Sequence, residues 1–116
     1  MAFQEKIDQL VTRLTELTER GKISWEDTAD EGTFLTSVGK FVVTLGEVPD
    51  YLRDEEGPFV RYRFKILDET GKTIDEASGT PGEDWNRLSH LHELARRSAL
   101  HVDEALSDIL SSLEHI

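Results

Sequence analysis

The sequence predicts an α+β fold: an N-terminal helix, an antiparallel sheet of three to four strands, and a C-terminal helical pair packed on one face of the sheet. Apolar residues recur every three or four positions near both ends of the chain, whereas residues 59–67 alternate strictly between apolar and basic side chains. A chain of 116 residues is one domain by length. We therefore expect a single domain over residues 1–116, with a helix at 3–20, a sheet within 22–78 and a helical segment at 83–114.

One apolar stripe predicts the first helix. Spacings of four and three residues place its members on one helical face: Phe3, Ile7, Leu10, Leu14 and Leu17. Arg20 gives a basic last turn, and Gly21 is typical of a left-handed cap that ends a helix.

The central segment has the composition of β-strands. Residues 33–48 are rich in β-branched and aromatic side chains, with Gly39 as a turn or bulge, and residues 22–27 are expected to add a short lead-in strand. The stretch "FVRYRFKIL" (59–67) alternates, which predicts one core face and one solvated face. The core face carries Val60, Tyr62, Phe64 and Ile66, and the solvated face carries Arg61, Arg63 and Lys65.

The stretch "DETGK" (68–72) predicts a hairpin turn, because Asp68 can bond its own turn and Gly71 supplies a positive φ. If Asp68 pairs with Lys72, then Ile66 faces Ile74 inside and Lys65 faces Asp75 outside.

Apolar residues also recur with helical spacing in the C-terminal third of the chain. Its predicted buried stripe consists of Leu88, Leu91, Ala95, Val102, Leu106, Ile109, Leu110 and Leu113. A break is expected near Leu100 and His101, with Asp103 as the cap of a second helix.

Two short features resemble those of a group of small bacterial proteins of uncharacterised function. One is a G-K-I-x-W step after the first helix, here Gly21–Trp25, and the other is an L-x-x-L-A-R…V-D-x-x-L ending, here Leu91–Leu106. The resemblance spans most of the chain and implies the order helix, antiparallel sheet, C-terminal helix. Its motifs are structural, so it supplies no functional residue.

Charge is the strongest compositional signal. Twenty-four acids and thirteen bases give a formal net charge of −11, which repels phosphate backbones and anionic lipids, so we expect no nucleic-acid partner and no membrane association. The composition, acidic and poor in lysine, resembles that of proteins from salt-loving organisms. It is also compatible with a basic partner, although ordinary solubilising charge is the favoured interpretation.

The chain has no cysteine, which excludes disulfides, a thiolate nucleophile and cysteine-ligated zinc. The start "MAFQEKIDQL" has no secretory-signal pattern, and no apolar run approaches the roughly 20 residues of a membrane span. We therefore expect a cytoplasmic location.

The stretch "SHLHELARR" (89–97) raises the question of a metal site. Residues two apart on a helix point in opposite directions, so His90 and His92 cannot share a metal ion. Glu93 and Arg97 are spaced for an i,i+4 ion pair, so the face with His90 is interpreted as solvated. No nucleotide, hydrolase or metalloprotease motif is present, and we expect no cofactor, no metal and no enzymatic activity.

Five residues remain as candidates for ligand or partner binding. Arg61, Arg63 and Lys65 form a basic row on an acidic protein, and the alternative is a wet sheet face paired with acids on neighbouring strands. Trp25 and Trp85 could line a pocket, but large aromatic residues beside a small core more often cover it.

Three functional hypotheses follow. The leading one is a non-enzymatic interaction module whose partner is a second copy, as a homodimer, or another protein. The second is a small-ligand binder with a pocket between sheet and helices, and the third is an acidic inhibitor, of immunity or antitoxin type, that binds a basic partner. A large exposed apolar patch would favour the module, a pocket with convergent polar groups would favour the binder, and a clustered acidic face would favour the inhibitor.

Overall fold

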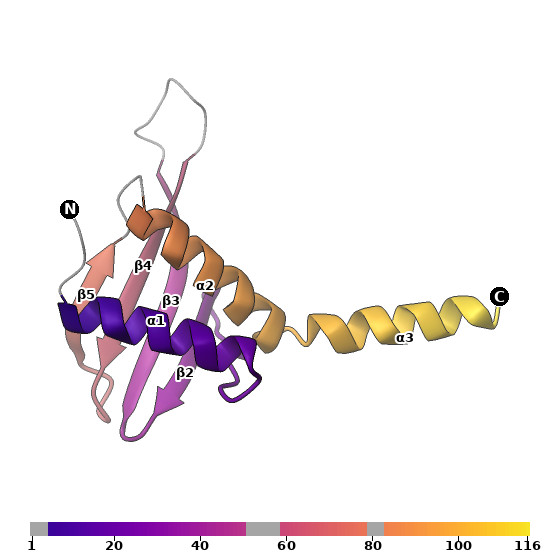
Figure 1. Ribbon diagram of the computed structural model, residues 1–116, viewed down its shortest axis with the longest axis horizontal. Helices are drawn as coiled ribbons and strands as arrows, with labels where there is room; N and C mark the ends of the chain where they lie inside the picture. Colours follow the sequence, from indigo (N-terminus) through magenta and orange to yellow (C-terminus); the bar gives the residue numbers. More distant parts are fainter. Residues whose placement is uncertain (1–4, 51–58, 79–82) are drawn as a thin grey trace.

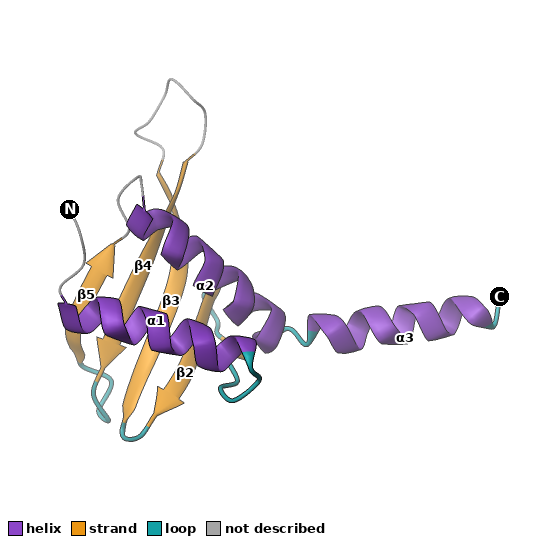
Figure 2. Ribbon diagram, viewed as in Figure 1, coloured by secondary structure: helices purple, strands orange, loops and turns teal. Residues whose placement is uncertain are grey.

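A five-stranded antiparallel sheet with two helices on one face forms the body of the protein, and a third helix projects from it (Figures 1 and 2). The structure is a computed structural model that describes residues 5–50, 59–78 and 83–116. Its elements in chain order are α1 (Glu5–Glu19), β1 (Glu26–Asp27), β2 (Thr33–Val38), β3 (Phe41–Asp50), β4 (Phe59–Leu67), β5 (Thr73–Ser78), α2 (Glu83–Ala99) and α3 (Val102–Glu114). The strands lie side by side in sequence order, and the α+β prediction is confirmed with five strands instead of three to four.

The first helix follows its sequence pattern. Ile7, Val11 and Leu14 are buried against the sheet, while the predicted start at Phe3 lies outside the described residues. At the other end, Gly21 adopts a φ of 70°. The amide of Gly21 donates to the carbonyl of Thr18, and that of Lys22 donates to the carbonyl of Leu17, the hydrogen bonds of a Schellman cap.

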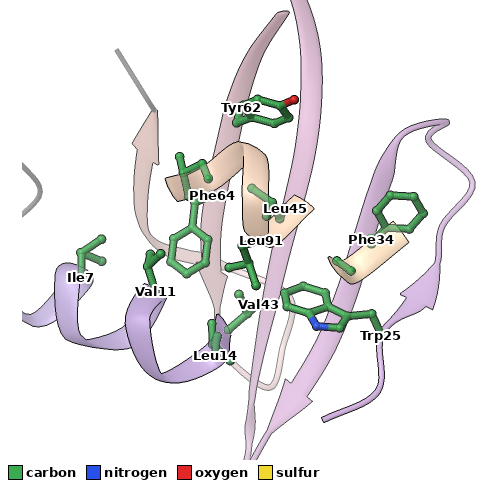
Figure 3. Close-up of a cluster of buried hydrophobic side chains, with 12 residues drawn as sticks. Ile7, Val11, Leu14, Trp25, Phe34, Val43, Leu45, Tyr62, Phe64 and Leu91 are labelled. Carbon is green, nitrogen blue, oxygen red and sulfur yellow. The ribbon is translucent and has the colours of Figure 1, made fainter. Parts of the chain in front are cut away.

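The sheet has one covered and one uncovered face, as the alternation in residues 59–67 predicts. Phe34 of β2 pairs with Leu45 of β3, which pairs with Phe64 of β4, and all three side chains are buried beneath the helices. Figure 3 shows these residues packed together with Leu91 of α2. Intervening residues therefore point to the opposite face, which none of the three described helices covers.

The hairpin between β4 and β5 differs from its predicted register. Asp68 does pair with Lys72, with 2.9 Å between the Asp68 amide nitrogen and the Lys72 carbonyl oxygen. However, Ile66 pairs with Asp75 and Lys65 with Glu76, because β5 contains one extra residue at a bulge beside Leu67. Ile74 is consequently 55% exposed and does not face Ile66 in the core, so that part of the prediction is wrong.

The predicted break in the C-terminal helical segment is confirmed. His101 has a left-handed conformation, with φ 52° and ψ 47°, and separates α2 from α3. His101, not Asp103, occupies the N-cap position; the Asp103 carboxylate instead accepts a hydrogen bond from Arg97 at 2.6 Å.

Only the first half of this segment packs on the sheet. Leu88, Leu91 and Ala95 of α2 are fully buried. By contrast, no residue of α3 is buried, and the helix points away from the body (Figure 1). The prediction that both helices pack on one face of the sheet is therefore wrong for α3, and its apolar stripe remains exposed.

Candidate functional site

The predicted basic row lies on the uncovered face of the sheet. Alternation along β4 points Arg61, Arg63 and Lys65 away from α1 and α2, and strand pairing places Lys65 beside Thr44 of β3. On the next strand, Leu35 of β2 pairs with Thr44. We call this surface the outer sheet face, defined by the outward residues of β2, β3 and β4.

A shallow hollow of about 250 Å³ occupies this face. Its lining is partly apolar, from Val48 and Leu67, and the Thr33 side chain lies against Gly46. Polar groups around it come from Thr28, Asp30, Thr33, Thr44, Arg63 and Lys65. The mixture of aliphatic lining and cationic side chains suits an amphipathic, acidic surface better than a small apolar ligand.

The cations of the row differ in their surroundings. The Nε of Arg63 lies 3.0 Å from the Glu76 carboxylate on β5, an exposed cross-strand ion pair of the kind expected as the alternative. Lys65 is half-buried and forms no ion pair with a described residue, although Glu76 is its neighbour in register. The positive charge of Lys65 is therefore available to a partner.

The two tryptophans do not belong to this face. Trp25 is part of the core, where its indole Nε1 donates to Thr18 and its amide donates to Ser98, so it joins α1 to α2. Trp85 lies on α2, donates to the Val60 carbonyl at 2.7 Å and packs against Tyr62. The structure thus brings together three of the five predicted residues, and the tryptophans serve the helix side of the sheet.

A second hollow, of about 440 Å³, lies on the helix side near His92. His92 is buried, with its Nε2 2.7 Å from the Gly32 carbonyl oxygen and its ring between those of Phe34 and Tyr62. Its Nδ1 is 4.0 Å from a carboxylate oxygen of Glu47. The histidine therefore connects α2 to the start of β2, a structural role that sequence reasoning missed; its spacing from Leu88 and Ala95 was the available signal.

The other side of α2 is solvated, as expected. His90 is exposed and lies 3.9 Å from Glu19 of α1. The predicted Glu93–Arg97 ion pair is wrong, because Glu93 pairs with Arg96 and Arg97 turns to Asp103. The hydrogen bond from Arg96 lowers the pKa of Glu93. Within residues 5–50, 59–78 and 83–116, no three histidine or carboxylate side chains group as ligands for a metal ion.

The apolar face of α3 is the largest departure from the sequence prediction. Leu106, Ile109, Leu110 and Leu113 are 49%, 55%, 64% and 58% exposed, respectively. They lie on one side of the helix, while its charged residues, Asp103, Glu104, Asp108 and Glu114, are all acidic. An exposed stripe of this kind is typical of a protein-interaction surface. We call it the α3 stripe.

Comparison with protein-family models, curated proteins and solved structures gives no match to this chain. The resemblance noted at residues 21–25 and 91–106 therefore stays a prediction. No helix in the described part of the chain combines the length and apolar character needed to cross a bilayer.

Proposed function

We propose that this protein is a non-enzymatic, self-associating interaction module, in which the α3 stripe docks onto a second copy. The exposure of that stripe carries the proposal, since four aliphatic side chains on one helix have no partner within the described chain. The same molecule has an uncovered, basic sheet face, so a donor surface and an acceptor surface coexist. We also propose that the protein is cytoplasmic, as expected from the sequence.

The energetics favour a reciprocal exchange of helices. Complete burial of a leucine or isoleucine contributes about 1.5–3 kcal/mol, so each half-exposed residue of the stripe offers roughly 1 kcal/mol. One docked helix then gives about 4 kcal/mol, near the lower limit of what association costs. Two exchanged helices double the gain, whereas the translational and rotational cost is incurred once.

Symmetry also favours a reciprocal exchange of α3 between two copies. If α3 of each copy docked onto a different neighbour, the contact would be head-to-tail and would produce open chains. If two copies exchange α3 with each other, a closed two-fold dimer results. The high net negative charge, −11, opposes the growth of larger assemblies.

The other two hypotheses have less support. In the space between sheet and helices, His92, Phe34 and Tyr62 pack together, and the remaining hollow is flanked by Glu47 and Glu93. An acidic inhibitor would need a clustered acidic face, but acids occur on both α1 and α3 as well as along β5.

Paired aspartate substitutions on the two sides of α3 test the proposal. We expect the double variant Leu106→Asp/Leu110→Asp to be monomeric by light scattering after gel filtration. The control Ser107→Asp/Ser111→Asp adds the same charge to the opposite side of the helix and should remain dimeric. Equal masses for the two double variants would contradict a role for the stripe.

A further inference from the structure

We infer that the acceptor for α3 is the outer sheet face of the second copy, with Asp103 and Glu114, the two acids that flank the α3 stripe, beside its basic row. This inference rests on the proposed function and specifies which surface of the partner is used. It assigns one role to two features: an acidic helix whose apolar stripe is exposed, and a basic, partly apolar sheet face that no helix of the described chain covers.

The dimensions of the two surfaces agree. With 13 residues, α3 is about 20 Å long. The nine residues of β4 extend over about 30 Å, so the sheet can accommodate the whole helix. In this arrangement each sheet lies between helices, with α1 and α2 of its own chain on one face and α3 of the partner on the other. Layers of this type are a common solution for a sheet with two apolar faces.

Charge complementarity favours the outer sheet face as the acceptor. The charged residues of α3 are four acids, of which Asp103 and Glu114 flank the stripe while Glu104 and Asp108 lie on the opposite side of the helix. Asp103 also pairs with Arg97 of its own chain. On the outer sheet face, Arg61 is exposed, Arg63 is exposed and paired with Glu76, and Lys65 forms no ion pair with a described residue. Docking there brings the flanking acids of α3 toward basic side chains, and it places the Leu106–Leu113 stripe over the apolar lining formed by Val48 and Leu67.

Pairing of α3 with α3 of the second copy is disfavoured by the shape of the stripe and by charge. Leu106, Ile109 and Leu113 fit a two-stranded seam, but Leu110 widens the stripe to the three positions per heptad that are typical of a helix packed on a globular surface. In addition, a helix pair would bring together the acids that flank each stripe, Asp103 and Glu114, without any lysine or arginine on either helix.

Intermolecular paramagnetic broadening tests the inference directly. Because the chain has no cysteine, Ser112→Cys provides a single attachment site for a spin label beside the stripe. The labelled copy, without isotope enrichment, is mixed with a nitrogen-15-enriched wild-type copy. We expect broadening of the Thr44 and Lys65 amides on the partner's sheet, while the Thr12 amide of α1 stays sharp.

The alternatives give different results. Broadening confined to α3 of the enriched copy would overturn the inference in favour of helix pairing. A doubly labelled chain that shows broadening of Thr44 and Lys65 only within the same molecule would overturn it in favour of intramolecular closure. With helix pairing, the dimer persists and the proposed function stands. With intramolecular closure, the protein is a monomer, and the inference and the proposed function both fail.

A charge reversal provides a second measurement. Lys65→Glu should weaken the dimer by tenfold or more, measured as the dissociation constant by sedimentation. Lys72→Glu makes the same change in the exposed β4–β5 turn, away from the outer face, and should have less than a threefold effect. Equal effects of the two reversals, in a protein that still dimerises, would overturn the acceptor assignment alone.

Discussion

At the scale of single residues, Asp68 organises the turn between β4 and β5. Its carboxylate accepts hydrogen bonds from the Thr70 hydroxyl at 2.6 Å and from the Thr70 and Lys72 amides at 2.9 and 3.0 Å. These bonds, that of Thr70 above all, hold the pKa of Asp68 below its ordinary value of 3.8. The ionised carboxylate therefore stabilises the folded state.

This lowered pKa predicts the pH dependence of an Asp68→Asn variant. Because the pKa of Asp68 is lower in the folded than in the unfolded protein, its carboxylate stabilises the fold at pH values above 3.8, its pKa in the unfolded chain. This stabilisation is lost as the pH falls through the pKa of the folded protein. We expect Asp68→Asn to have a lower urea midpoint than the wild type at neutral pH, with the difference shrinking below about pH 4. Glu69→Gln removes a neighbouring charge whose carboxylate bonds no described residue, and it should change little. A constant difference between Asp68→Asn and wild type across pH would contradict the assignment.

Gly46 is required by a close approach between β2 and β3. A Cβ at this position would lie 2.4 Å from the Thr33 hydroxyl oxygen, and its three nearest atoms would all belong to Thr33. We expect Gly46→Ala to destabilise the protein by about 1–3 kcal/mol, the usual range for overpacking. Adding Thr33→Ala should restore most of that stability. Additive losses in the double variant, measured by urea denaturation, would show that the collision is not the cause.

The sequence predicted part of the candidate site at this scale. The alternation along β4 was sufficient to place Arg61, Arg63 and Lys65 on one solvated face, because side-chain direction in a strand depends on position alone. It could not place Trp25 or His92. Their surroundings depend on contacts with Ser98 and Gly32, which are 73 and 60 residues away in the chain.

At the scale of secondary-structure elements, periodicity predicted where helices and strands occur but not every contact between them. The β4–β5 register was wrong because a single extra residue at a bulge leaves the apolar and polar pattern of each strand intact. The predicted packing of α3 on the sheet was wrong for a different reason. An apolar stripe indicates that a helix will be buried, but it does not indicate which molecule buries it.

The separation of α3 from the body predicts that the body folds without it. The contacts of α3 with the rest of the described chain include the Arg97–Asp103 ion pair beside His101, whereas the core residues lie in the elements that precede α3. We expect a chain ending at His101 to unfold cooperatively. Its melting temperature should be independent of protein concentration, whereas that of the full chain should rise with concentration because association stabilises the folded state. Concentration dependence in both chains, followed by circular dichroism, would place the association surface elsewhere.

At the scale of the whole molecule, shape and charge both bear on association. The radius of gyration is 15.9 Å, against about 13 Å for a compact chain of this length. The projecting α3 contributes to this extension (Figure 1). The net charge of −11 opposes the association of many copies, so we expect a closed dimer.

The same net charge predicts that added salt stabilises the protein. Like charges crowd on folding, and counterions screen their repulsion over about 10 Å at 0.1 M. Exposed ion pairs such as Arg63–Glu76 are screened too, but each contributes only about 0–1 kcal/mol. We expect the urea midpoint to rise from low salt to molar sodium chloride. A series in sulfate separates screening from surface exclusion, and a flat or falling midpoint in chloride would refute the repulsion argument.

The mass of the wild-type protein in solution tests the central claim most directly, because docking of the α3 stripe on a second copy requires a dimer. Sedimentation equilibrium over a concentration series should converge on twice the chain mass of 13.2 kDa and rise no further. A mass of 13.2 kDa at every concentration would contradict self-association, and a mass that keeps increasing with concentration would contradict the closed exchange of α3 helices.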